Sequence, residues 1–213
     1  MSVEFIINGL IQYGLLLFLL SCHEAGHAAA ALACGDDTAK KLGRVTINPI
    51  AHIDLVGTVL LPLLMIFGGS VFNGMPMIFG WAKPVPFVPS KLRNPQRDGV
   101  LIAMAGPAVN LLLACLLLPL AKLGGMVAAV VAFGAYISLI LCFFNLIPVP
   151  PLDGSHVLKY VTGMSDLFYA RLSQLGFIVI LVIINIPIVR LTLAKVTSGT
   201  FDLIARLYGL PYG

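Results

Sequence analysis

The chain has 213 residues, of which 59% are hydrophobic and only 10% are charged, and its formal net charge is +4. A soluble domain carries about 25% charged residues, so this chain lacks the polar groups needed to cover a water-facing surface. The composition argues against a soluble enzyme, a disordered protein and a disulfide scaffold. The basic residues lie between apolar runs, where they set orientation in a bilayer, so the positive charge does not indicate nucleic-acid binding.

Charge-free runs of about 20 apolar residues predict helices that cross the bilayer. The first run covers residues 5–22 and extends over 28–34 if the polar residues between the two remain helical. Two more runs cover 99–121 and 123–152. The run 172–189 precedes a tail with basic residues, which predicts a short span or an interfacial helix at the C-terminal end.

The run 55–82 is less regular, because prolines and glycines break it into pieces shorter than a span. It predicts a re-entrant hairpin or a kinked span. Such backbone occurs at membrane depth only where it is buried in protein or lines a cavity, so we expect this segment beside the functional site. The whole pattern predicts an all-α polytopic membrane protein with about four to six transmembrane helices.

The strongest functional motif is His23-Glu24-Ala25-Gly26-His27, an H-E-x-x-H sequence. Residues four apart lie on one face of a helix, with Cβ atoms about 5–6 Å apart, so both imidazoles can reach one metal ion. Glu24 lies between them, where its carboxylate can act on a metal-bound water without being a ligand.

The alternative is that these three ionisable residues face a polar cavity by accident. An ionisable group at the centre of a bilayer helix costs roughly 2.5 to 3.5 kcal/mol, so three of them within five residues need a compensating partner. A bound divalent cation is the simplest partner, which favours the metal interpretation.

A catalytic zinc ion normally has three protein ligands and one open position, so the two histidines require a third ligand. The candidates are His52, Asp54, Asp98, Asp153, His156 and Asp166. The apolar context favours Asp153, which directly follows the charge-free run 123–152. Several prolines before it keep the backbone from continuing as a plain helix, so its carboxylate can turn inward.

The motifs HEAGH and NLIPVPPLDG, the latter at residues 145–154, resemble the two signature motifs of the site-2 protease family of intramembrane zinc metalloproteases. Three blocks between them also occur in the family's order: NPIAHID at 48–54, GWAKPVP at 80–86 and AGPAVN at 105–110. The resemblance covers about residues 15–160.

This resemblance implies that His23, His27 and Asp153 bind one Zn²⁺ ion per chain and that Glu24 is the general base. Asn145 matches a family asparagine that helps to position substrate or to polarise its carbonyl. The alternative for Asn145 is a hydrogen bond between helices.

The resemblance also implies the activity of a zinc metalloendopeptidase that cleaves peptide bonds in or near transmembrane segments of membrane-protein substrates. The expected partners are those segments and the lipid bilayer, with no nucleic acid, and the expected location is the plasma (inner) membrane of a prokaryote. We expect a short family member without a PDZ or nucleotide-sensing domain. Residues 1–213 then form one domain, with a catalytic core over about 5–160 and a C-terminal span and tail over 172–213.

The alternatives are a metal-binding transporter and a non-catalytic relative of the family. A transporter would use the same ligands for passage and needs no dedicated base, so Glu24 favours an enzyme. Every motif residue is present, which argues against a non-catalytic relative.

Three other features have simpler interpretations. His52 and Asp54 are interpreted as polar residues at a membrane boundary, in preference to a pair that supports the metal ligands. Residues 105–107 predict a close contact between helices made by small residues. His156 is interpreted as a solvated loop histidine.

The depth of the histidines predicts the membrane face to which the site opens. His27 and His23 precede Cys34 by about 10 and 16 Å of helix, so the site lies nearer the end that follows Cys34. If the runs 99–121 and 123–152 are antiparallel, Asp153 reaches this depth only with residues 35 and 98 on one side. That side then carries Lys40, Lys41, Arg44, Lys83, Lys91, Arg93, Arg97, Lys159 and Arg171, opposite Lys122.

The positive-inside rule makes this basic side cytoplasmic, so we predict an outside N-terminus and a site that opens toward the cytoplasm. In a background with the four native cysteines replaced, single cysteines at positions 38 and 94 should react with a membrane-impermeant thiol reagent from the cytoplasmic face alone. Labelling of the two positions from opposite faces would contradict this topology.

Overall fold

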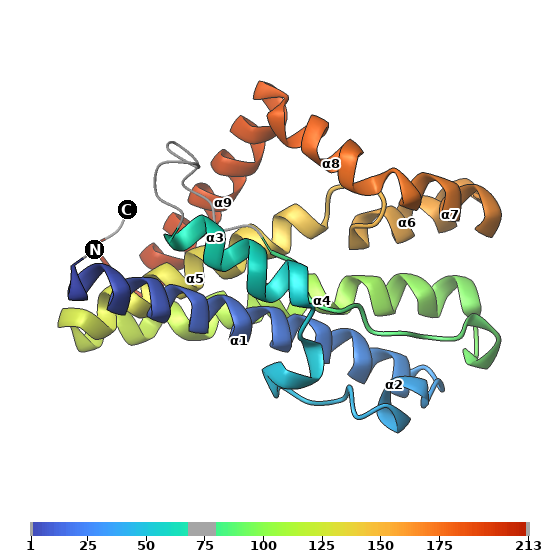
Figure 1. Ribbon diagram of the computed structural model, residues 1–213, viewed down its shortest axis with the longest axis horizontal. Coiled ribbons are helices and arrows are strands. Elements are labelled where there is room, and N and C mark those ends of the chain that lie inside the picture. The colour runs from blue at the N-terminus through green and yellow to red at the C-terminus, as the bar shows by residue number, and fades with distance from the viewer. Residues whose placement is uncertain (1, 68–79, 212–213) are drawn as a thin grey trace.

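The computed structural model describes residues 2–67 and 80–211, and every regular element within them is helical (Figure 1). Three helices are long and apolar enough to cross a membrane: α1 (Val3–Ala33), α4 (Pro95–Leu117), which continues into the 3₁₀ segment η5 (Leu118–Leu123), and α5 (Gly125–Asn145). The expected all-α polytopic membrane architecture is therefore confirmed.

The first span is a single helix of 31 residues, about 46 Å long at 1.5 Å per residue. The polar residues 23–27 remain helical, so the apolar runs on either side of them belong to one span. Ser2 begins the helix by accepting a hydrogen bond from the Phe5 N–H at 3.2 Å. Because α1 exceeds the roughly 30 Å of the hydrocarbon core, its ends extend to both membrane surfaces.

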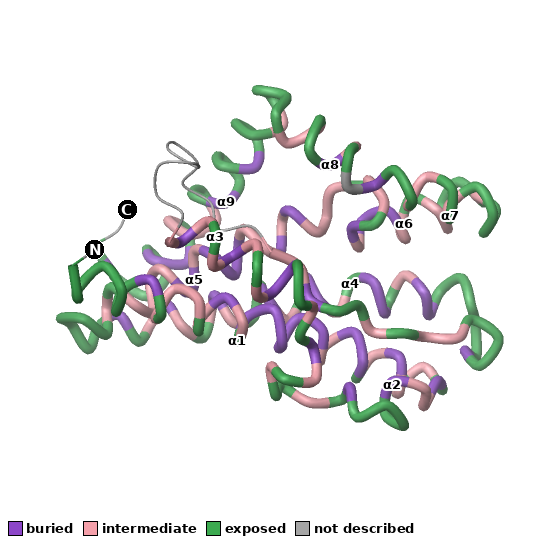
Figure 2. Tube along the Cα trace, in the orientation of Figure 1, coloured by how far each residue is buried: buried purple, intermediate pink, exposed green. Residues whose placement is uncertain are grey.

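Helix α4 packs against both α1 and α5. One core cluster joins Leu16, Leu19 and Leu20 of α1 to Ile137 of α5. The side chains that remain exposed on the outer faces of the spans include large apolar residues, such as Leu112, Leu116 and Leu10. Figure 2 shows buried positions concentrated where the helices meet and exposed positions on the outer faces, as expected for spans that face lipid.

The C-terminal part consists of α6 (Asp153–Thr162), α7 (Asp166–Gln174), α8 (Gly176–Asn185) and α9 (Pro187–Leu207). The expected run 172–189 is not one straight span, because α7 and α8 meet at a bend of 69°. Helix α8 ends before Pro187, which disfavours helical backbone in the residue before it, and Ile186 is extended.

Helix α9 continues through Arg190 to Leu207 and packs against α5. A second core cluster, which includes Ala114, Leu118 and Leu139, takes in Ile204 and Ala205 of α9. If the bent pair α7–α8 forms one span, the described residues contain four candidate spans, and otherwise three. The number lies at or just below the lower end of the expected range.

Short helical segments connect the spans: α2 (Thr38–Lys41), η1 (Pro49–His52), the π-helical η2 (Leu55–Leu60), α3 (Leu61–Phe67) and η4 (Pro89–Lys91). The expected irregular segment 55–82 begins with η2 and α3, and α3 packs against α1. Residues 68–79 lie outside the described part, so a re-entrant hairpin and a kinked span both stay predictions.

Residues 80–88 form an extended segment that follows α1 toward its C-terminal end (Figure 1). Prolines at 84, 86 and 89 disfavour helix in this segment. Three backbone N–H groups hold it in place: that of Lys83 donates to the His52 carbonyl, that of Val85 to the Glu24 carboxylate, and that of Val88 to the Asp36 carboxylate.

Asp36, just after α1, anchors the far end of this segment. Its side chain is fully buried. One carboxylate oxygen accepts from the Thr38 N–H and hydroxyl, and the other accepts from the Val88 N–H. The Lys91 ammonium lies 3.7 Å away. Burial raises the pKa of Asp36, but these hydrogen bonds outweigh burial and lower the pKa below its usual value.

Replacement of Asp36 by Ala should destabilise the protein, because it leaves buried backbone N–H groups without an acceptor at about 1–3 kcal/mol each. We expect a lower unfolding midpoint in detergent and faster proteolysis within residues 83–89. Asp37→Ala is the matched control, since Asp37 makes only exposed ion pairs with Lys41 and Lys91, which are worth about 0–1 kcal/mol. Equal midpoints for the two variants would contradict the anchoring role.

Candidate metal centre

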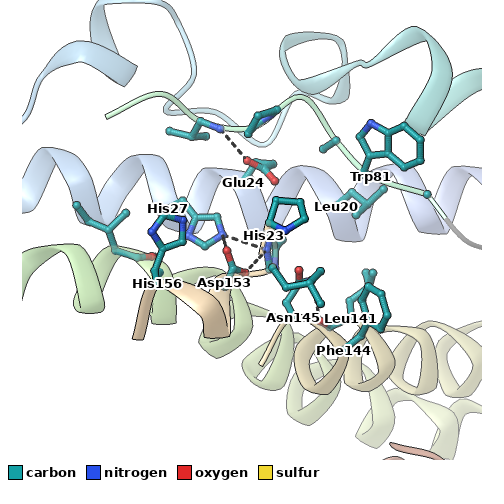
Figure 3. Close-up of a pocket in the computed structure, with 18 of the residues that line it drawn as sticks. Leu20, His23, Glu24, His27, Trp81, Leu141, Phe144, Asn145, Asp153 and His156 are labelled. Atoms are coloured by element: carbon teal, nitrogen blue, oxygen red, sulfur yellow. Dashed lines mark hydrogen bonds and ion pairs between the residues drawn. The ribbon is translucent and has the colours of Figure 1, made fainter. Parts of the chain in front are cut away.

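Two helices bring three ligand-type side chains together inside the bundle. His23 and His27 lie one turn apart on α1, and Asp153 is the first residue of α6. One ligand atom from each residue lies within 4.8 Å of the other two. The Nε2 atoms of the two histidines are 3.0 Å apart, and the Asp153 oxygens lie 3.1 Å from His23 Nε2 and 3.3 Å from His27 Nε2. The structure thus brings together the three ligands expected from the sequence (Figure 3).

The chain reaches this position through a short non-helical connection after α5. Helix α5 ends at Asn145, and α6 begins at Asp153, so the proline-containing residues 146–152 form the turn. Gly154 allows the turn to close, because a Cβ atom there would lie 2.2 Å from the Leu146 carbonyl oxygen. Several prolines before Asp153 therefore have the effect expected from the sequence, which is to end the helix and turn the carboxylate inward.

The three residues fit a zinc ion in their chemistry and their spacing. Donor atoms of a tetrahedral zinc site stand about 3.3 Å apart, since each lies about 2.0–2.1 Å from the ion. His27 Nδ1 is 2.7 Å from the Ile102 carbonyl, which can only accept, so Nδ1 carries the proton and Nε2 of the neutral ring is free for a metal. Asp153 Oδ2 is buried and has no hydrogen-bond partner among the described residues.

Asp153 supplies a negative charge at this position. Burial raises the pKa of its carboxyl, but the contacts with His23 and His27 outweigh burial and hold the pKa below its usual range. A carboxylate that binds a metal is ionised, so Asp153 would bring one negative charge to a bound ion. Two neutral imidazoles and one carboxylate form a donor set that catalytic zinc sites use.

Gly106 of α4 lets the two imidazoles lie against that helix. A Cβ atom at this position would stand 2.3 Å from His27 Nε2 and 2.6 Å from His23 Cε1. Within residues 105–107, interpreted from the sequence as a helix contact, Gly106 thus forms part of the wall of the site, and the Ala105 backbone lies against Gly26 of α1. Asn110, one turn further along α4, lies with its side-chain amide 3.0 Å from His23 Nδ1. Sequence reasoning missed this contact, although AGPAVN stood out as a block.

Glu24 lies beside the metal ligands and outside their group. Its carboxylate is largely buried and accepts a hydrogen bond from the Val85 N–H at 3.1 Å. The structure therefore places Glu24 between the ligand-bearing face of α1 and the extended segment 80–88, as Figure 3 shows. Nothing in this arrangement assigns Glu24 to the metal as a fourth ligand.

Asn145 ends α5 at the edge of the same cavity. Its Nδ2 donates to the Leu141 carbonyl at 2.9 Å, within α5. The amide nitrogen therefore makes a hydrogen bond within α5 and not the bond between helices that was the alternative. A substrate-positioning role for Asn145 stays a prediction.

An open cavity of about 610 Å³ adjoins the ligands. One end is polar and contains the three ligands, Glu24 and His156, and the other is apolar and contains Leu20, Trp81, Leu141 and Phe144 (Figure 3). Apolar walls with a few convergent polar groups are typical of ligand-binding cavities.

His156 does not lie in a solvated loop, so that interpretation was wrong. It lies on α6, lines the cavity and stacks loosely on Tyr169, with ring centroids 5.1 Å apart. Burial lowers the pKa of His156, which keeps its ring neutral. His156 follows Asp153 by three residues, which is about one helical turn. Because the residues after Asp153 were expected to form a loop and instead form α6, this spacing was not used to place His156 beside the ligands.

The remaining third-ligand candidates serve local structure. Asp54 caps η2 by accepting from the N–H groups of Val56 and Gly57. Buried His52 donates from Nε2 to the Thr46 carbonyl. Asp98 accepts from the Asn94 N–H at the start of α4, and Asp166 pairs with Lys159.

Comparisons with known proteins indicate a family of peptidases. Residues 119–186, which include Asn145 and Asp153, match the model of peptidase family M50. The chain is 35% identical over 209 residues to "Putative zinc metalloprotease YwhC" of Bacillus subtilis, an alignment that covers 91% of this chain and 88% of the relative.

Two mycobacterial proteins named "Putative zinc metalloprotease Rip2" are also similar. The identity is 30% over 197 residues for the protein of Mycobacterium tuberculosis, covering 88% of this chain and 71% of the relative. For the protein of Mycolicibacterium smegmatis it is 27% over 192 residues, covering 87% and 71%. No solved structure matches the chain.

Replacement of Gly106 by Ala should abolish metal binding, because the added methyl group would occupy space held by the two imidazoles. We expect the zinc content of the purified protein to fall from near one per chain to near zero. Gly14→Ala in α1 is the matched control, since a Cβ atom there meets nothing within 4 Å. A Gly106→Ala variant that keeps stoichiometric zinc would show that the imidazoles do not bind at this wall.

Proposed function

The chain belongs to peptidase family M50, the site-2 protease family, and we propose that it is a zinc-dependent endopeptidase that cleaves peptide bonds in or near transmembrane segments of membrane proteins. The observation that carries the proposal is the His23–His27–Asp153 group, in which both histidines are buried and Asp153 is partly buried, beside a partly apolar cavity. Names of the relatives support zinc and proteolysis, and the apolar spans support a membrane location.

His23, His27 and Asp153 would hold one zinc ion. A zinc ion with such ligands polarises a carbonyl and lowers the pKa of water to about 7. Glu24 follows His23 directly and lies close to the ligand group, but it accepts its hydrogen bond from the Val85 N–H. One carboxylate oxygen accepts this hydrogen bond, and the other can take the proton of the attacking water and pass it to the leaving amine.

The apolar end of the cavity supports a transmembrane segment as substrate. Leu20, Leu141 and Phe144 can receive apolar side chains, whereas a water-soluble peptide would lose hydration there. A helical peptide bond is shielded by its own hydrogen bonds, so the substrate must unwind before cleavage.

The extended segment 80–88 offers a place for the unwound chain to lie. It borders the cavity with Trp81 and Val85 and runs beside the ligand-bearing part of α1 (Figure 3). The N–H groups of Val85 and Val88 already donate to carboxylates, so carbonyl groups are the better-placed partners for a substrate strand, in the manner of strand addition. Asn145, at the same cavity, is the candidate to hold the substrate carbonyl.

We also propose that the protein lies in the plasma (inner) membrane of a prokaryote, with the site toward the cytoplasm. The C-terminal end of α1, α2, the start of α4 and the helices α6 and α7 gather at one end of the bundle (Figure 1). These elements carry five basic residues, Lys40, Lys41, Arg97, Lys159 and Arg171, whereas η5, which carries Lys122, lies at the opposite end. This arrangement supports the positive-inside argument.

Ligand and base are separable by substitution. Asp153→Ala removes one of three metal ligands, so zinc content and cleavage should fall together. Glu24→Gln keeps a similar volume and removes the proton acceptor, so it should keep close to one zinc per chain while cleavage falls by about 10²–10⁴-fold or more. Metal analysis of the purified variants beside a cleavage assay measures both effects.

Membrane proteomes of cells that express the native chain or Glu24→Gln supply the substrate test. Membrane proteins that are fragmented in the first case should accumulate at full length in the second. If no precursor accumulates while the metal is retained, the chain is a metal-binding protein of another kind, such as a transporter. If Glu24→Gln loses the ion and Asp153→Ala keeps it, the ligand assignment is wrong.

A further inference from the structure

The two histidines of the metal centre differ in what holds the far side of each ring. His27 Nδ1 is 2.7 Å from the Ile102 carbonyl, which fixes the proton on Nδ1 and the lone pair on Nε2. His23 Nδ1 is 3.0 Å from the Asn110 side-chain amide. An amide carries both a donor and an acceptor, so this contact, unlike the first, is compatible with either ring tautomer.

The zinc site distinguishes the two possibilities. The Asn110 side chain is completely buried, and its Oδ1 has no hydrogen-bond partner within residues 2–67 and 80–211. If Nε2 of His23 binds the metal, Nδ1 of the neutral ring carries the proton, and an amide nitrogen facing Nδ1–H would place two donors against each other. Rotation of the amide by 180° fills the same volume and brings Oδ1 to the ring, where it can accept a hydrogen bond from Nδ1–H.

We propose that Asn110 is a positioning residue that accepts the Nδ1–H of His23 and thereby directs the Nε2 lone pair of that ring to the metal. The inference rests on the proposed zinc site. Ligating histidines commonly donate their second ring N–H to a carbonyl or carboxylate, which fixes the tautomer and the ring orientation. Asn110 then accepts a hydrogen bond from Nδ1 of His23, as the Ile102 carbonyl accepts one from Nδ1 of His27. Both rings thus present Nε2 to Asp153.

Helix α4 is held in the place that this role requires. The Asn110 backbone carbonyl accepts a hydrogen bond from the Ser138 hydroxyl of α5 at 2.7 Å. Gly106, between Ile102 and Asn110 on α4, lets the imidazoles approach the helix. Residues 102, 106 and 110 follow one another at helical-turn spacing along one side of α4. Helix α1 runs antiparallel to α4 (Figure 1), so His27 faces Ile102 and His23 faces Asn110.

Two substitutions of Asn110 test separately whether its side chain accepts a hydrogen bond from His23 or donates one to it. Asn110→Leu keeps the approximate volume and removes the acceptor, so zinc affinity should fall by about 10–100-fold, the usual cost of losing such a partner. Asn110→Asp keeps an acceptor and removes the donor, so its affinity should stay within about threefold of the native value. Gly14→Ala is the control, since a Cβ atom there meets nothing within 4 Å, and it should retain native affinity.

The measurement is competition of the full-length protein in detergent with a zinc chelator, with the unfolding midpoint of each variant recorded. Nitrogen-15 NMR of the histidine rings in the zinc-loaded native chain should show His23 protonated at Nδ1, a result that needs no variant to fold. Native affinity in a folded Asn110→Leu variant would overturn the proposal, as would equal losses in Asn110→Leu and Asn110→Asp, or zinc bound through Nδ1 of His23. Failure of the native chain to bind zinc would instead overturn the metal site itself.

Discussion

Burial of polar ligands inside an apolar bundle is the constraint on which the structure of this site depends. An imidazole placed in the middle of a membrane span must find a partner for each ring nitrogen, because an unsatisfied buried group costs about 1–3 kcal/mol. His23 and His27 can therefore lie in α1 only where a neighbouring helix offers polar groups at the same spacing. Helix α4 does so with the Ile102 carbonyl and Asn110.

The close contact of α1 and α4 has consequences on the other side of α1. With both imidazoles turned toward α4 and Asp153, Glu24 points toward the extended segment 80–88 and accepts the Val85 N–H. Asp36 fixes the same segment further along at Val88. The proposed base is thus hydrogen-bonded to the extended segment that borders the cavity.

Local patterns in the sequence were enough to predict the features that depend on neighbouring residues. Histidines four apart share a helix face whatever surrounds them, and the apolar runs 5–22 and 28–34 predicted one span on the condition that the residues between them remain helical. Asp153 could be chosen among six candidates because the prolines before it end a helix, which is a local effect. The same local reasoning was wrong for His156, and it treated 172–189 as one run where Pro187 and a bend divide the chain.

The sequence by itself determined the membrane composition, the helical spans, the metal-binding motif and the most favoured third ligand, since each follows from composition or from spacing along one element. Only the tertiary structure decided what the rings touch. Gly106 and Asn110 lie about 80 residues from the histidines along the chain, and no periodicity links residues so far apart. Their relation is set by how closely two helices pack, which depends on the side chains of both helices together.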